Sequence, residues 1–181
     1  MSENSSKARL HIARYYAELL VKQIEPACER VEIAGSIRRQ KPMVGDIEIV
    51  AIPKPSVDLF DNKSYCPDIV YRAIQGVMLH PPRFEKQGQF YARFKFFGMD
   101  TDLFITTPEK WGCIFLIRTG SADFSRRIMT RKWQGGYCPD NLSFRDGRMW
   151  SADSTEPLDT PEEIDVFRNL GLGWIEPENR I

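Results

Sequence analysis

Two acidic side chains, Asp46 and Glu48, stand two residues apart in the apolar run 46–52. Alternate residues of a strand point to the same face, so these carboxylates would lie side by side, as a pair of Mg²⁺ ligands requires. A third carboxylate on a neighbouring strand would complete the site; Asp102 is the candidate, and Asp100 could share its face. Two ions held in this way would activate an attacking hydroxyl and stabilise a leaving pyrophosphate.

A turn with the residue types of a phosphate site precedes this run. Gly35 would let the backbone approach a ligand closely, and Ser36 offers an N–H and a hydroxyl to a phosphate oxygen. Arg39 can add a forked contact to the same anion. The same residue types also occur in ordinary turns and on solvated strand faces, so they leave both interpretations open.

The charge of the chain is unevenly distributed. The 181 residues have a net charge of zero, but residues 1–145 hold 22 basic and 16 acidic side chains, and residues 146–181 hold 3 and 9. A zero total therefore does not exclude a nucleic-acid partner. The densest basic cluster suits either phosphate contacts or a solvated helix face. Its members are Arg118, Arg126, Arg127, Arg131 and Lys132.

Cysteine and histidine usage excludes several other kinds of site. The four cysteines form no Cys-x-x-Cys pair, which argues against a structural zinc site, and two histidines are too few for most histidine-based catalysis. No apolar run approaches the ~20 residues of a membrane span, and residues 1–6 are too polar for a signal peptide. We therefore expect an intracellular protein with reduced cysteines and no membrane partner.

The elements that would position these residues mix helices and strands without strict alternation, which predicts an α+β fold. A boundary is expected near residue 107. Thr160 is predicted to cap the last helix, with Glu163 completing a capping box. The hydrophobic spacing predicts helices over 8–30, 66–79, 107–133 (with a break near 120–121) and 160–170. Strands are predicted over 31–34 and 46–52, and two more over 90–106 with a turn at 98–100. A further hairpin over 142–150 would turn at Asp146-Gly147.

Four segments resemble X-family DNA polymerases, the DNA polymerase beta group. Residues 34–49 are similar to the family's nucleotide-binding and metal signature, and residues 101–104 to the strand with its third metal aspartate. Residues 111–121 resemble the helix that leads to the Thr-Gly-Ser turn beside the incoming nucleotide. Residues 161–178 resemble the closing helix and the ending that follows it. Together these segments span most of the chain.

The resemblance implies a nucleotidyltransferase palm over residues 1–107, with a mixed sheet flanked by helices. A small helical C-terminal nucleotide-selection domain with a β-hairpin would follow over 108–181. Two Mg²⁺ ions, with Mn²⁺ as an alternative, would be held by Asp46, Glu48 and Asp102, the last accepting the primer hydroxyl proton. The nucleotide would contact Gly35, Ser36, Arg39, Gly45, Thr119 and Gly120. DNA phosphates would contact Arg126, Arg127, Arg131 and Lys132, and Lys86, Arg93 and Lys95 could extend that track.

The implied function is a DNA polymerase that adds deoxynucleotides to a primer 3′-hydroxyl. The partners would be primer-template or gapped DNA and deoxynucleoside triphosphates. We expect a monomer that fills short repair gaps without lyase activity, a reduced form as found in some viruses or phages.

The sequence departs from the family pattern at Glu48, where the best-known members have Asp. It departs again at Ile117-Arg118, where vertebrate enzymes have Tyr-Phe, and at Ser125 and Met129 in place of Asn and Arg. These departures leave two alternatives open. One is a template-independent or non-DNA nucleotidyltransferase, and the other is a non-catalytic nucleic-acid-binding module.

Overall fold

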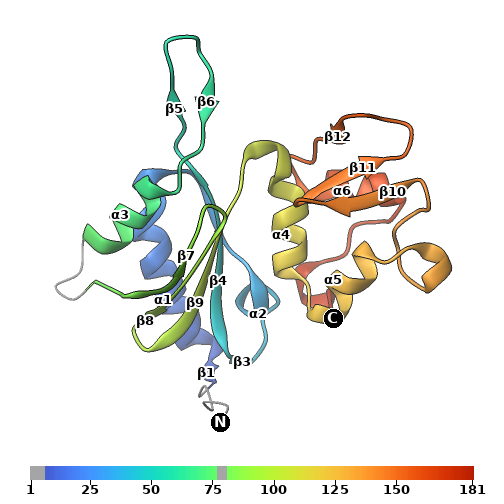
Figure 1. The fold of residues 1–181 in the computed structure, drawn as a ribbon. Helices are drawn as coiled ribbons and strands as arrows, with labels where there is room; N and C mark the ends of the chain where they lie inside the picture. Colours follow the sequence, from blue (N-terminus) through green and yellow to red (C-terminus); the bar gives the residue numbers. More distant parts are fainter. Residues whose placement is uncertain (1–6, 77–80) are drawn as a thin grey trace. The chain divides into compact units, whose positions relative to one another are not determined.

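The computed structural model describes residues 7–76 and 81–181. The chain divides into two compact units, one up to Thr107 and the other from Pro108. Both units combine helices with strands, so the expected α+β class is confirmed (Figure 1). Within the described residues, none of the helices has the length and apolar character that a membrane crossing needs.

The first unit is organised by a five-stranded sheet with the order β2-β4-β9-β8-β7. The sheet is mixed, because β4 runs parallel to β9 while the other neighbours are antiparallel. Two small strand pairs, β1 with β3 and β5 with β6, lie outside it. The elements are β1 (Ala8–Arg9), α1 (Leu10–Ile24), η1 (Glu25–Ala27), β2 (Cys28–Ile33), α2 (Gly35–Arg38), β3 (Met43–Val44), β4 (Asp46–Pro53), β5 (Ser56–Val57), β6 (Lys63–Ser64), α3 (Asp68–Gly76), β7 (Phe84–Gln87), β8 (Tyr91–Phe96) and β9 (Met99–Ile105).

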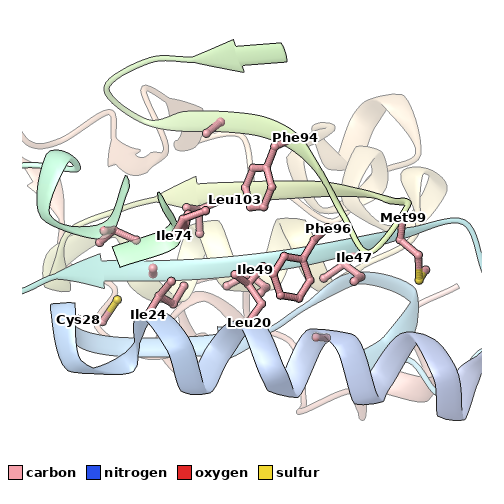
Figure 2. Packing of buried hydrophobic residues seen from close by; sticks show 14 of the residues in the cluster. Leu20, Ile24, Cys28, Ile47, Ile49, Ile74, Phe94, Phe96, Met99 and Leu103 are labelled. Atoms are coloured by element: carbon pink, nitrogen blue, oxygen red, sulfur yellow. The ribbon is translucent and has the colours of Figure 1, made fainter. Parts of the chain in front are cut away.

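The core of this unit lies between one face of the sheet and helix α1. The helix buries a stripe at three- and four-residue steps: Ala13, Ala17, Leu20 and Ile24. Figure 2 shows Leu20 and Ile24 against the inward side chains of β4, with Ile74 of α3 beside them. Alternation along β4 then decides which side chains face away from this core. The inward set on the central strands is Ile47, Ile49, Ala51, Phe94, Phe96 and Leu103.

The first helix is shorter than the hydrophobic spacing predicts. It ends at Ile24, and Pro26 lies in the 3₁₀ turn Glu25–Ala27, which leads directly into β2 at Cys28. The predicted helix to residue 30 is therefore wrong, because proline supplies no backbone N–H to continue the α-helical ladder. In the helix predicted over 66–79, α3 occupies Asp68–Gly76, and the end of the prediction lies outside the described residues.

The second unit packs three α-helices of the described chain against a small antiparallel sheet with the order β10-β11-β12. The predicted hairpin is confirmed: Arg145 pairs with Arg148 across Asp146 and Gly147, which have φ values of 52° and 73°. Two consecutive positive φ values are typical of a type I′ turn, which favours this dipeptide. The elements are η2 (Pro108–Lys110), α4 (Trp111–Thr119), α5 (Ala122–Met129), η3 (Lys132–Gln134), β10 (Leu142–Arg145), β11 (Arg148–Ser151), β12 (Pro157–Leu158), α6 (Glu163–Leu170) and η4 (Pro177–Asn179).

Helix α4 approaches the start of α6 closely. The Gly112 N–H donates to the Thr160 carbonyl at 2.7 Å, and a Cβ on Gly112 would overlap the carbonyl of Glu162. The predicted cap of α6 is wrong by two residues, because Thr160 is buried against η2. Glu162 is the N-cap instead, and its side chain and that of Asp165 form the reciprocal bonds of a capping box.

Candidate active site and nucleic-acid interface

Four carboxylates gather on the face of the sheet that points away from the core. The parallel register of β4 and β9 places Asp46 opposite Asp100, and Glu48 opposite Asp102. All four side chains are half-buried and alternate with buried residues along their strands. The structure therefore brings the three residues expected from the sequence onto one face and adds Asp100 to them.

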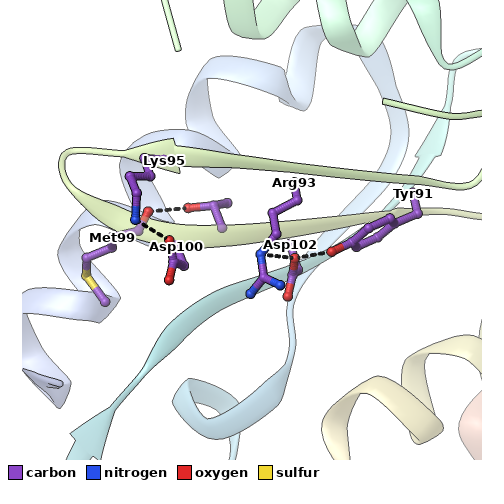
Figure 3. A network of polar contacts seen from close by, with 7 residues as sticks. Tyr91, Arg93, Lys95, Met99, Asp100 and Asp102 are labelled. Carbon is purple, nitrogen blue, oxygen red and sulfur yellow. Dashed lines mark hydrogen bonds and ion pairs between the residues drawn. The ribbon is translucent and has the colours of Figure 1, made fainter. Parts of the chain in front are cut away.

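Strand β8 lies on the other side of β9 and supplies the partners of two of these carboxylates (Figure 3). The Tyr91 hydroxyl donates to Asp102 Oδ1 at 2.6 Å, and Arg93 Nε lies 3.4 Å from the same oxygen. Lys95 Nζ is 2.6 Å from Asp100 Oδ1. The face thus combines acidic groups on β4 and β9 with cationic groups on β8.

These β8 residues have roles that reasoning from the sequence missed. Tyr91 was not singled out, and Arg93 and Lys95 were expected only as an extension of a DNA track. A usable signal was present, because all three alternate with apolar residues that must face the core. Those residues are Ala92, Phe94 and Phe96.

The electrostatics of the face show the cost of placing like charges together. Burial raises the pKa of the Asp46 carboxyl, and the Asp102 and Asp100 carboxylates raise it further, while Arg93 and Arg39 oppose the shift. The Asp102 carboxylate also raises the pKa of the Arg93 guanidinium, and for this cation the shift reflects attraction, because it stabilises the charged form. A cation bound on this face would relieve the repulsion that Asp46 experiences.

The predicted phosphate turn forms the start of helix α2. Gly35 has a φ of +60°, and a Cβ at this position would overlap the carboxylate of Glu48. Only glycine therefore leaves room for Glu48 as it lies here. The Ser36 hydroxyl is buried and has no hydrogen-bond partner among the described residues. An unsatisfied buried hydroxyl is costly, and it suits a ligand oxygen.

Arg39 follows α2 on the same side of the unit as the carboxylates. Burial lowers the pKa of its guanidinium, and the carboxylates of Glu48 and Asp46 oppose this shift. Gly45 joins β3 to β4, and the space that its Cβ would occupy is open. Arg39 is therefore within electrostatic reach of both β4 carboxylates.

The carboxylates fit a hard divalent cation by donor type, because oxygen ligands are what Mg²⁺ prefers. In the part of the chain that the structure describes, however, no three His, Cys, Asp or Glu side chains converge closely enough to hold a metal ion. In this conformation Glu48 lies against Gly35, and Asp102 is held by Tyr91 and Arg93. The oxygen donors therefore suit Mg²⁺, while contacts within the protein set the present positions of Glu48 and Asp102.

The Thr-Gly-Ser turn joins α4 to α5 in the second unit. Thr119 is fully buried at the end of α4, so of the predicted pair only the half-buried Gly120 reaches the surface. The Ser121 hydroxyl caps α5 by accepting from the Phe124 N–H at 3.1 Å. A Cβ on Gly120 would meet the Phe124 ring at 2.5 Å, so the turn needs glycine for packing.

The predicted DNA-binding residues follow this turn on α5 and the loop after it. Arg126, Arg127 and Lys132 are exposed, and Arg131 is half-buried with Nη1 donating to the Asp140 carbonyl at 2.6 Å. The Arg127 guanidinium lies 4.6 Å from the centre of the Tyr137 ring. Two of the four cations are therefore partly fixed by contacts within the unit. Arg126 also forms a surface ion pair, with Asp123.

Residues 114–181 match the family model of the DNA polymerase beta thumb. This match supports an X-family, DNA polymerase beta-like protein. The match begins within α4 and includes the four predicted DNA-binding residues, which form the basic cluster of the thumb: Arg126, Arg127, Arg131 and Lys132. A search of curated proteins found no match. The thumb match indicates polymerase-related DNA binding by this polymerase beta-like chain.

Proposed function

We propose that the chain is a DNA polymerase that transfers deoxynucleotides to a primer 3′-hydroxyl, with the first unit as a nucleotidyltransferase palm. The observation that carries this proposal is the set of facing carboxylates on β4 and β9, in a chain with a polymerase beta thumb. The buried Ser36 hydroxyl and Arg39 beside these carboxylates supply groups that a triphosphate needs.

Asp46, Glu48 and Asp102 would hold two Mg²⁺ ions, which when bound supply Lewis-acid stabilisation of the phosphoryl oxygens. Asp102 would accept the proton of the primer hydroxyl. Tyr91 and Arg93 both engage Oδ1 of Asp102, which leaves Oδ2 as the atom that receives this proton. The Tyr91 bond also fixes the carboxylate plane, so the base is oriented before the primer binds.

The triphosphate would lie on the Gly35-Ser36 turn. The Ser36 hydroxyl would donate to a phosphate oxygen, and the Arg39 guanidinium would neutralise part of its charge. Gly120 would contact the incoming nucleotide, and the basic cluster of the thumb would hold DNA phosphates. We propose short gapped DNA as the substrate, with deoxynucleoside triphosphates as the second substrate.

The test is extension of a primed, gapped duplex by the wild-type chain and by Asp102→Asn, which keeps the size of the side chain and removes its charge. We expect extension by the wild type and a loss of at least 100-fold in the variant, since a proton acceptor contributes about 10²–10⁴-fold. Asp61→Asn, an exposed carboxylate on the β5–β6 hairpin, is the matched control. Equal extension by the wild type and by Asp102→Asn would overturn the site assignment.

A second candidate, template-independent addition, is favoured by one observation in the thumb. Ser125 stands where the family has an Asn near the base, and its hydroxyl donates to the Ile117 carbonyl at 2.7 Å. Ser125 is also buried, so it is used to join α5 to α4 rather than to contact a base. Incorporation of each nucleotide on a single-stranded primer alone would support this candidate over templated synthesis.

A further inference from the structure

Trp133 is the most exposed aromatic side chain among the described residues of the thumb. Trp133 lies in the 3₁₀ turn Lys132–Gln134 and is 70% exposed. The other described tryptophans have partners within the protein: Trp111 is fully buried, Trp150 lies beneath Arg145, and Trp174, which is 42% exposed, lies beneath Arg180. Burying an indole ring is normally favourable because of its large apolar surface, so a tryptophan exposed to water needs an explanation.

The exposure is not the result of a loosely held loop. The Lys132 N–H donates to the Cys138 carbonyl at 2.8 Å, and the Gly135 N–H donates back to Lys132 at 3.0 Å. A Cβ on Gly136 would overlap the Thr130 carbonyl, so the backbone here is closely packed. The backbone therefore fixes the position of Trp133. Binding of a ligand to its ring would cost little entropy, because the turn is already ordered.

Basic residues adjoin Trp133 along the chain. Arg131 and Lys132 immediately precede Trp133, and Arg126 and Arg127 lie on the adjoining helix. Cations that hold backbone phosphates around an aromatic ring that stacks on bases are the combination with which proteins bind single-stranded nucleic acid. Bases inside a duplex are already stacked on each other, so a ring of this kind takes an unpaired base.

We propose that Trp133 stacks on an unpaired base of the DNA that the thumb binds, in the template strand where it leaves the duplex. The proposal rests on the proposed function for the presence of DNA at the thumb, and it adds the class of nucleotide that this surface takes. The cluster of cations would hold the phosphates on either side of that base.

The experiment measures binding by fluorescence anisotropy, with no nucleotide or metal added. It uses a blunt duplex, the same duplex with a five-nucleotide 5′ overhang, and a third in which the overhang carries abasic sites. We expect Trp133→Ala to weaken binding of the overhang duplex about tenfold, within the range for loss of one stacked base. Binding of the blunt and abasic duplexes should not change, and Trp133→Phe should retain most of the overhang affinity. Phe60→Ala, which truncates an exposed ring on the β5–β6 hairpin, is the control.

Two results would overturn the proposal. Equal weakening on all three duplexes would mean that Trp133 supports the thumb or contacts the duplex, and no weakening on any of them would mean that the ring serves another partner. Melting temperatures of the variants, expected to equal that of the wild type, separate a folding defect from a binding defect. Because binding is measured without catalysis, a chain that binds the overhang through Trp133 but extends no primer would contradict only the proposed polymerase activity.

Discussion

Arg180 and Glu163 form a buried ion pair in the second unit. Arg180 Nη1 lies 2.5 Å from Glu163 Oε1, and the two side chains are 0% and 5% exposed. The Arg180 guanidinium also lies over the rings of Phe167 and Trp174, and its Nε donates to the Ile175 carbonyl at 2.9 Å. The pair joins the last residues of the chain to helix α6, within the region that matches the thumb.

Removing Arg180 should destabilise the second unit severely. Breaking a buried pair leaves an uncompensated charge, here on Glu163, so we expect Arg180→Ala to lower the free energy of unfolding by about 3–5 kcal/mol. Urea denaturation followed by tryptophan fluorescence measures this change. Arg168→Ala is the matched control, because Arg168 pairs with Asp165 at the surface of the same helix and should contribute less than about 1 kcal/mol. A similar change in both variants would contradict the role assigned to Arg180.

Strand alternation made the central part of the fold predictable. The run 46–52 alternates polar and apolar residues at its start, and β4 begins at Asp46 and places Asp46 and Glu48 on one face. The Asp146-Gly147 turn was equally informative, because few dipeptides tolerate two positive φ values in succession. In both cases the local sequence alone decides the geometry.

The contacts of the candidate site depend on residues that are further apart in the sequence. Which cation meets Asp102 is decided by the antiparallel register of β8 and β9. The turn that sets this register lies at Phe97 and Gly98, which have positive φ, and not at the predicted 98–100. Alternation places Tyr91 and Arg93 on one face but does not say which carboxylate stands opposite. The predicted N-cap of α6 was wrong for a similar reason, because the burial of Thr160 against η2 is a tertiary contact that local sequence does not reveal.

Only one cysteine should react quickly with a thiol reagent in the folded chain. Cys66 is exposed, while Cys28, Cys113 and Cys138 are buried. Burial raises the pKa of the Cys28 thiol to about 12 and that of Cys113 to about 11, so near pH 8 both are almost wholly protonated and unreactive. Reaction with a coloured disulfide reagent at pH 8 should show one fast thiol per chain, and Cys66→Ser should remove it. Two or more fast thiols would contradict the buried positions.

Tyr91 should act as a positioning residue for Asp102 in the proposed reaction. Tyr91→Phe removes only the hydroxyl that donates to Asp102 Oδ1 at 2.6 Å. A hydrogen bond to a charged group contributes about 1.5–3 kcal/mol, so loss of part of it should lower kcat about tenfold while KM for the nucleotide stays the same. Single-nucleotide incorporation on gapped DNA measures both constants. Tyr15→Phe, on an exposed part of α1, should match the wild type, and a Tyr91→Phe enzyme with wild-type kcat would exclude this role.

The basic cluster of the thumb should set the salt dependence of DNA binding. Replacing Arg126, Arg127 and Lys132 together by Gln removes three exposed cations and leaves Arg131, whose guanidinium is bonded to the Asp140 carbonyl. For every cation that neutralises a phosphate in the wild type, its replacement should reduce the slope of log K against log salt by about 0.9 on a duplex, because fewer counterions are released on binding.

A control variant shows whether a change in salt slope comes from this surface or from the lower net charge of the whole chain. A double variant of Lys54 and Lys63, both exposed near the β5–β6 hairpin of the first unit, lowers the net charge without touching the thumb. Anisotropy titrations of a gapped duplex at several salt concentrations should show a smaller slope for the thumb variant alone. If the triple variant keeps the wild-type slope, the cluster is a solvated helix face and the DNA phosphates are held elsewhere. If both variants lose slope equally, the effect belongs to net charge and not to a specific surface.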